Sequence, residues 1–376
     1  MMPRIAHKTA FAAFIFLMGC IEPYEPPYSD KDVGFFVVDG FLDSGNKTAT
    51  VKLSFAVPLD ASTTANPARK ATVSVEREDG SVISLTETSD GVYKTSSDLI
   101  ETGKKFKLRV SINSKEYVSD PVPLKASPVL DTITWRADHR GVTIYLDSHD
   151  VAGATKYYQW LYTETWEYVA NRLTTMRWTG DKVVGLKPEQ MVYTCYGTNI
   201  STKVLITSTS TNTQDVVNDF PLAFVPAGST KLRRLYSIEV EQRAIDEQAY
   251  TYWLNLQRTT EGLGGLFDPM PNEVTGNIRN AKNSSERVLG YFSGGEIQKK
   301  RLFIKSDDLP NEVLSWPAYC PDYNIDTPTL RADYTNKEVY LITVVVEDHY
   351  TTASPICIDC RLLGGVTKRP DFWPAR

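Results

Sequence analysis

Three side chains that could bind a metal ion lie close together in the segment LDSHDV. These are Asp147, His149 and Asp150, and carboxylate and imidazole groups are ligands that many divalent metals accept. No further ligand pair at a matching spacing accompanies them, so a polar turn after a strand is the simpler interpretation. The sequence also lacks a Gly-x-Ser-x-Gly elbow, a His-Glu-x-x-His pair and a Gly-Lys-Ser/Thr phosphate loop. We therefore predict a protein that is not an enzyme, with no catalytic group and no metal site.

A second acidic segment, PDYNIDTPTLRAD, has the alternation of a calcium-binding loop. Asp322, Asn324 and Asp326 occupy alternate positions, and such loops bind calcium through carboxylate and amide oxygens. The glycine that the sixth position requires is Thr327 here, and the twelfth residue is Asp333 instead of glutamate. These departures favour an ordinary polar loop. We expect no non-covalent cofactor.

Four of the five cysteines lie in the second half of the chain. Cys195, Cys320, Cys357 and Cys360 form an even number, which in an exported protein favours two disulfides. The CIDC pair has no second ligand pair for zinc, and RLLGG follows it where a thioredoxin-type motif would open a helix. Four cysteines allow three pairings, so the connectivity stays open. We expect at least one cysteine of CIDC to bond a distant partner; a bridge within CIDC is the alternative.

Cys20 carries the most specific signal for covalent chemistry. It ends the apolar run AFAAFIFLMGC, which is too short to span a bilayer and follows a basic N-terminal segment. This layout is that of a bacterial secretory signal, and LMGC matches the lipobox whose cysteine is diacylated and becomes the mature N-terminus. We predict a signal peptide over 1–19, a lipidated tether over 20–33, and diacylglycerol and acyl lipid (palmitate) on the cysteine. An ordinary signal peptide with a chance cysteine is the alternative.

The composition excludes a nucleic-acid partner and favours strands. Loss of residues 1–19 removes two basic residues, so the mature charge is 39 − 46 = −7, which is no basic footprint for nucleic acid. No later segment is apolar enough to span a membrane, so membrane contact should be through the lipid alone. The mature length favours two domains, and the 20 tyrosines and 7 tryptophans favour β-structure.

Two β-sandwiches are expected from the strand pattern. Residues 34–126 contain short alternating segments separated by turn sequences such as DSGN, EDGS and SDG, as in an immunoglobulin-like sandwich. Prolines in VSDPVPLKASP mark its end. Residues 127–376 open like a fibronectin type III domain. This second sandwich contains an inserted helix over about 246–261, for which Asp246 is the expected N-cap and Gly262 the stop.

The segment YYQWLYTETWEY predicts an unusually long aromatic strand. Alternation places Glu164, Trp166 and Tyr168 on the same face as Trp160, which is the expected core tryptophan. An unpaired carboxylate is costly in a core, so Glu164 suggests that this end of the strand projects as an aromatic binding surface. Packing of the same side chains under an inserted helix is the alternative, and it is favoured.

A glycine-rich loop over 262–277 is the second candidate recognition surface. It carries Leu266, Phe267 and Met270 between two prolines and several glycines, and it lacks the residues that a nucleotide site needs. Packing against a neighbouring domain is the alternative. The chain then ends with Phe372 and Trp373, which are too apolar for a free tail and should pin it to the second sandwich.

Several blocks resemble a known family. The resemblance is carried by the lipobox with CIEPYEP and by the segments FFVVDGFL, YYQWLYTETWEY and VLGYF. The most specific blocks are YTYWLNLQRTTEGLGGLFDPMPNEVTGNI and CIDCRLLGGVTKRPDFW. Through these blocks the chain resembles a domain-of-unknown-function family of Bacteroidota outer-membrane lipoproteins. The resemblance covers essentially the whole mature chain. Members of this family are commonly encoded beside TonB-dependent receptors that import glycans or peptides.

The resemblance implies an accessory or docking role at the outer membrane beside such a receptor, and it supplies no catalytic residues. An independent lipoprotein that binds a glycan or a peptide is the alternative function. Glu22 and Glu25 follow the lipidated cysteine and resemble acidic surface-export signals, so we expect a lipid anchor in the outer membrane with the protein facing the cell surface.

Overall fold

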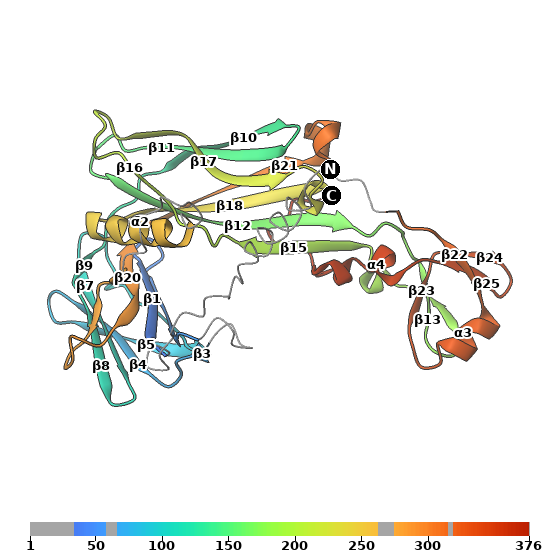
Figure 1. Cartoon of the computed structure of the whole chain (residues 1–376), viewed down its shortest axis with the longest axis horizontal. Coiled ribbons are helices and arrows are strands. Elements are labelled where there is room, and N and C mark those ends of the chain that lie inside the picture. The colour runs from blue at the N-terminus through green and yellow to red at the C-terminus, as the bar shows by residue number, and fades with distance from the viewer. Residues whose placement is uncertain (1–33, 58–65, 262–273, 315–318, 376) are drawn as a thin grey trace, which may run out of the picture.

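The computed structural model describes residues 34–57, 66–261, 274–314 and 319–375, and its regular structure is mainly β. Figure 1 shows three bodies, which we name the first sandwich, the second sandwich and the distal lobe. The predicted signal peptide, Cys20, the tether, and Leu266, Phe267 and Met270 lie outside the described residues. None of the helices in the described ranges is long and apolar enough to span a membrane.

Alternating burial builds the first sandwich, because side chains along each strand point in turn to the core and to solvent. β4 and β5 form the hairpin expected at EDGS, where Gly80 has a φ of 88°. The strands before residue 126 are β1 (Phe36–Asp43), β2 (Thr48–Phe55), β3 (Asn66–Pro67), β4 (Thr72–Arg77), β5 (Val82–Ser89), β6 (Val92–Ser96), β7 (Lys105–Ile112), β8 (Lys115–Ser119) and β9 (Val122–Pro123).

The segment 34–126 holds most of this sandwich but not all of it. The strand order β19-β8-β7-β4-β5-β6-β2-β1-β20 includes β19 (Ile278–Asn280) and β20 (Val288–Gly295) from far along the chain. β20 lies parallel to β1, from Phe36 opposite Val288 to Asp43 opposite Gly295. The expected boundary therefore needs correction. Within 34–126 alone β1 and β8 would be sheet edges, and the later strands β20 and β19 pair with them.

The second sandwich packs two antiparallel sheets face to face. Ile144, Trp160 and Ile238 lie in its core, and Trp160 is the core tryptophan expected from the sequence. One sheet contains β10 (Leu130–Asp138), β11 (Gly141–His149) and β17 (Val216–Pro226). The other contains β15 (Thr194–Ile200), β12 (Tyr157–Val169), β18 (Leu235–Ala244) and β21 (Ile297–Lys305), with β16 (Leu205–Ser208) paired to β12.

The expected helix is present as α2 (Glu247–Glu261). Asp246 caps it, because its carboxylate accepts a hydrogen bond of 2.7 Å from the backbone N–H of Ala249. Its most buried residues are Ala249 and Tyr252, and Tyr252 packs on Tyr291 of β20 with ring centroids 4.7 Å apart. Figure 1 shows α2 between β12 and the first sandwich, so the helix joins the two bodies.

The distal lobe was not expected from the sequence, which we interpreted as one sandwich over 127–376. It extends from the ends of β12 and β15, on the right in Figure 1. One of its sheets contains β14 (Val183–Gly185), β13 (Met176–Trp178) and β23 (Val339–Leu341). The other contains β22 (Tyr323–Asp326), β25 (His349–Thr352) and β24 (Thr343–Val346). The helices α3 (Thr327–Asp333) and α4 (Pro355–Ile358) complete it.

Short 3-10 helices connect several of these elements: η2 (Pro188–Gln190), η3 (Thr230–Leu232), η4 (Ser306–Asp308), η5 (Asn311–Val313) and η6 (Cys360–Leu363).

Two long-range disulfides hold the distal lobe and the C-terminal segment. Cys195 bonds Cys360 across 165 residues, and Cys320 bonds Cys357 across 37 residues. The predictions of two disulfides and of a distant partner for at least one cysteine of CIDC are confirmed, and the alternative bridge within CIDC is wrong. Since each cysteine of CIDC has a different partner, this short segment fixes η6 to β15 and α4 to the start of β22.

The aromatic tail is pinned to the second sandwich, as predicted. Trp373 is only 5% exposed, and its indole N–H donates a 2.9 Å hydrogen bond to Glu167 of β12. Its ring meets Tyr196 and Phe303 edge to face. Phe372 lies beside it and is covered by the guanidinium of Arg301, 3.6 Å above the ring centroid.

Candidate functional site

The predicted aromatic surface on β12 is wrong, because its side chains are packed. Glu164 is 3% exposed, and its carboxylate accepts hydrogen bonds from Lys231 at 2.6 Å, Tyr236 at 2.8 Å and Asn199 at 3.0 Å. A buried carboxylate is costly only when it is unpaired, and this one is fully paired. Burial, and then the charge of Glu164, raises the pKa of the Tyr236 phenol well above its usual value.

The neighbouring aromatic rings pack in the same way. Trp166 lies opposite Gly197, where an added Cβ would collide with the indole, and its ring centroid is 5.1 Å from the Lys231 ammonium. Tyr168 is 1% exposed and donates a 2.8 Å hydrogen bond to the backbone carbonyl of Cys360. The far end of β12 therefore supports the C-terminal segment. The favoured packing is confirmed, but its partner is the C-terminal segment and not the inserted helix.

The first group of metal-ligand candidates does not converge. His149 Nδ1 lies 2.6 Å from the carboxylate of Asp131, and this hydrogen bond raises the pKa of His149. Asp147 accepts a 2.7 Å hydrogen bond from the backbone N–H of Asp219. Asp150 instead accepts three backbone N–H groups of the turn that follows it, as the turn interpretation requires.

The calcium-loop candidates are also held by other partners. Asp322 forms a 2.6 Å ion pair with Arg172, and Asp326 caps α3 through the backbone N–H of Thr329 at 2.8 Å. Asn324 pairs with β25 in the middle of β22. In the part of the chain that the structure describes, no group of three or more His, Cys, Asp or Glu side chains converges as a metal site would require.

The distal lobe carries the most exposed apolar surface. Val344, Val345 and Val346 lie on β24 and are 48%, 51% and 59% exposed. β24 is the outer strand of the order β22-β25-β24 and has no second strand partner among the described residues. We name these three valines the distal edge. An apolar edge strand of this kind is a template on which another strand can pair.

Exposed apolar side chains are concentrated in this part of the chain. Among the described residues, 17 large apolar side chains are well exposed, and 10 of these lie within residues 319–375. They include Tyr319 at 91%, Ile356 at 52% and Tyr323 at 46%. Six of the ten, from Tyr319 to Ile356, lie on the distal lobe, and the other four lie on the C-terminal segment. Scattered exposed residues need no explanation, whereas a group of them on one lobe is typical of interaction surfaces.

One segment of the lobe is acidic, whereas the other, residues 170–190, has four basic and two acidic side chains. Residues 319–350 contain six acidic and two basic side chains, so their formal charge is 2 − 6 = −4. Two of the acidic residues, Glu347 and Asp348, form the turn that directly follows the distal edge. A partner that pairs with this edge gains electrostatic attraction if it carries basic residues.

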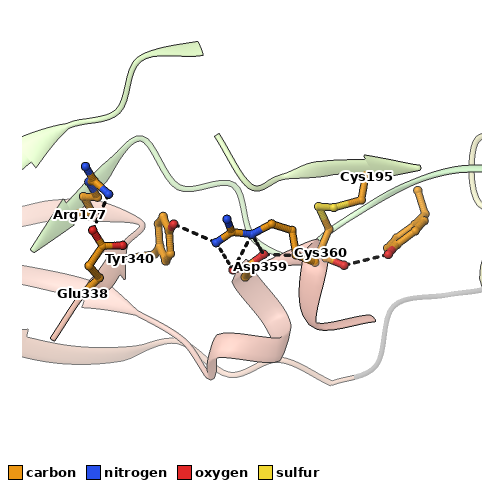
Figure 2. A network of polar contacts seen from close by, with 8 residues as sticks. Arg177, Cys195, Glu338, Tyr340, Asp359 and Cys360 are labelled. Atoms are coloured by element: carbon orange, nitrogen blue, oxygen red, sulfur yellow. Dashed lines mark hydrogen bonds and ion pairs between the residues drawn. A yellow bond between two sulfur atoms is a disulfide. The ribbon is translucent and has the colours of Figure 1, made fainter. Parts of the chain in front are cut away.

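A chain of polar contacts fixes the lobe to the sandwich, as Figure 2 shows. Arg177 of β13 pairs with Glu338 at 2.6 Å, beside β23. Arg361 donates to the hydroxyl of Tyr340 at 3.2 Å and to the Asp359 carboxylate at 2.7 Å and 2.9 Å. Bonding to Asp359 raises the pKa of Arg361, so this guanidinium stays charged.

From this network the connection continues through a covalent bond. Cys360 directly follows Asp359, and its disulfide to Cys195 reaches β15 (Figure 2). The phenol of Tyr168 on β12 donates a hydrogen bond to the backbone carbonyl of the same cysteine, Cys360. The distal edge is therefore carried on a lobe that is bonded to two neighbouring strands of the second sandwich.

Sequence analysis did not identify the distal edge. The run LITVVV is apolar except for Thr343, and such a run normally predicts a strand that is buried on both faces. The acidic pair that follows it was the one signal of an exposed turn. Whether a strand is central or at an edge depends on the pairing order, which the local sequence does not contain.

The fold and this surface define a mainly β protein of several bodies with an exposed apolar edge strand. The chain belongs to the DUF4249 family, described as a domain of unknown function, whose family model matches residues 21–301. The match covers both sandwiches in large part and ends within β21, before the second segment of the distal lobe. No curated relative matches the chain.

Solved structures of tandem β-domains resemble the chain. The FN1–FN3 domains of chicken CNTN1 are 12% identical, with 55% of this chain and 60% of that chain covered and a TM-score of 0.20. A segment of two fibronectin type III domains from chicken tenascin is 8% identical, with 55% and 89% covered and a TM-score of 0.15. The chain thus spans less than two thirds of the CNTN1 structure. The architecture given above rests on the strand pairing of this chain alone.

Proposed function

We propose that the chain is a non-enzymatic lipoprotein of the outer membrane that docks on a TonB-dependent nutrient-uptake receptor as its accessory component. The lipobox at Cys20 supports the lipid anchor, and the sequence blocks that resemble lipoproteins encoded beside such receptors support the choice of partner. Cys20 precedes the first described residue, Gly34, by 14 residues, which reach at most about 50 Å when fully extended. Both sandwiches can therefore stay near the membrane surface.

The exposed distal edge is the observation that carries the docking proposal. It presents three apolar side chains in a row on an edge strand, held on a disulfide-bonded lobe. The proposed occupant is an extended segment of the receptor with basic residues, which adds to β24 as a further strand. Backbone hydrogen bonds supply the affinity, and the acidic turn selects the basic flank.

A lysine on the distal edge tests this proposal. In the variant Val345→Lys the side chain stays in solvent, so folding is preserved, while an edge lysine disfavours strand addition. The full-length tagged protein is isolated from its own membranes, and the amount of receptor barrel that accompanies it is measured by mass spectrometry. We expect at least a tenfold loss of receptor, corresponding to about 1.4 kcal/mol.

The matched control is Val82→Lys on β5, where the valine is 60% exposed on the first sandwich. This control should retain the receptor. Equal recovery of the receptor with both variants would contradict docking at the distal edge.

A further inference from the structure

A cleft of about 330 Å³ lies where the first sandwich, the second sandwich and α2 meet. Its upper wall is the outer face of β12 and β18, where Gln159 and Arg243 are direct cross-strand neighbours. Phe41 of β1 forms the opposite wall and Trp253 of α2 closes one side. Figure 1 shows these elements together, with α2 above β1 and β20 and below β12. A volume of this size is at the lower end of small-molecule sites.

Three polar atoms in the walls of this cleft are buried without a hydrogen-bond partner among the described residues. They are Gln159 Oε1, Arg243 Nε and Trp253 Nε1. Gln159 is only 5% exposed, so the side chain of this amide is almost completely removed from bulk solvent. Buried polar atoms are nearly always paired, because an unpaired one costs roughly 1 to 3 kcal/mol. Three of the eight such atoms among the described residues line this one cleft, and a bound molecule that reaches them would complete their hydrogen bonds.

The arginine in this wall is held in place by other contacts. Its guanidinium lies 3.9 Å above the ring centroid of Phe41, and its Nη2 donates to Glu241 at 3.3 Å. Arg243 thus connects the two sandwiches while its Nε remains available. Since the Arg243 guanidinium is already oriented, a ligand that accepts a hydrogen bond from Nε costs the side chain little additional conformational entropy.

The charged side chains that line the cleft have no net charge, which favours a neutral ligand. The lining contains the acidic Asp39 and Asp43 and the basic Lys52 and Arg243, so the formal sum is 2 − 2 = 0. Two unpaired N–H donors and one unpaired amide oxygen require a ligand that both accepts and donates hydrogen bonds. A hydroxyl group does both, whereas a carboxylate only accepts.

We propose that this cleft between the sandwiches binds a neutral, hydroxyl-rich ligand of monosaccharide to disaccharide size. Its hydroxyl groups accept from Arg243 and Trp253 and donate to Gln159. The apolar face of such a ring packs on the indole of Trp253, as sugar rings do on aromatic side chains. The site is separate from the distal edge, so it does not depend on receptor docking.

Direct binding to the full-length protein tests the proposal. The protein is kept in a detergent without a sugar headgroup, and calorimetry and saturation-transfer NMR follow glucose, galactose, N-acetylglucosamine and maltose. Glucuronate, glucosamine and trialanine are the charged and peptide comparisons. We expect saturable binding of at least one neutral sugar below about 10 mM, and at least tenfold weaker binding of the charged sugars and the peptide.

Two variants remove the unpaired atoms at nearly constant side-chain shape. Gln159→Met and Trp253→Phe should each weaken sugar binding about three- to tenfold, the usual effect of one lost hydrogen bond. Trp135→Phe on β10, in the opposite sheet, is the matched control and should bind like the parent protein. Val345→Lys should also bind the sugar like the parent protein, which shows that sugar binding in the cleft does not depend on the distal edge.

Three results would overturn the proposal. They are no saturable binding of any neutral sugar, unchanged binding in both cleft variants, and equal or tighter binding of the charged or peptide probes.

Discussion

Removal of the Cys320–Cys357 disulfide should destabilise the distal lobe selectively. This bond closes a loop of 37 residues, and the chain-entropy relation gives about 4 kcal/mol of stabilisation for a loop of that length. Both cysteines are buried, and the double variant Cys320→Ala/Cys357→Ala also removes the 2.9 Å hydrogen bond from the Asn171 amide to Cys320 Sγ. The first sandwich contains no cysteine and has its own core, so its stability should not change.

Native-state hydrogen exchange measures this effect locally. A loss of about 4 kcal/mol accelerates exchange through opening of the lobe about 10³-fold, since each 1.4 kcal/mol is a factor of ten. Peptides that contain β13 and β23 report the distal lobe, and peptides that contain β4 and β7 are the internal reference. Unchanged exchange in the lobe, or an equal increase in the first sandwich, would refute this account of the disulfide.

Three further outcomes follow from charged or covalently modified side chains. Lys231→Met should lower the free energy of unfolding in urea by about 3 kcal/mol, because it leaves the Glu164 carboxylate buried without its cation. This value is the low end of the range for breaking a buried ion pair, since the Lys231 side chain is 24% exposed. In an NMR titration His149 should have a pKa above 6.5, and Asp131→Asn should return it toward that value. Because the folded-state pKa of His149 is raised, the stabilisation from the His149–Asp131 pair is present below pH 6.5 and is lost as the pH rises through the folded-state pKa. A His149 pKa that does not change in Asp131→Asn would disprove the pairing. Mass spectrometry should find the mature N-terminus at a lipid-modified Cys20, and Cys20→Ser should release the protein from membranes, whereas an unmodified N-terminus elsewhere would exclude lipidation.

Local sequence signals predicted the individual elements well. Alternation and turn residues located the β4–β5 hairpin, and the cap at Asp246 located the start of α2 within one residue. The even number of cysteines, with an apolar tail, predicted a C-terminal segment bonded to distant parts of the chain. These features depend on neighbouring residues or on simple counting, so one sequence is enough to find them.

Features that depend on strand order were missed. Nothing in the residues of β20 states that it pairs in parallel with β1, more than 200 residues earlier. The paired carboxylate of Glu164 could not be distinguished from an exposed one, since its partner Lys231 lies 67 residues further along. The cleft was missed for the same reason, because only the register of β12 with β18 brings Gln159 beside Arg243.

Site-specific photo-crosslinking in living cells tests the central claim, docking through the distal edge, most directly. A photoreactive amino acid replaces Val345 on β24 or, as the control, the equally exposed Val82 on β5. The account predicts a covalent adduct with a TonB-dependent receptor from position 345 and none from position 82. Absence of a receptor adduct from position 345, or equal adducts from both positions, would contradict it.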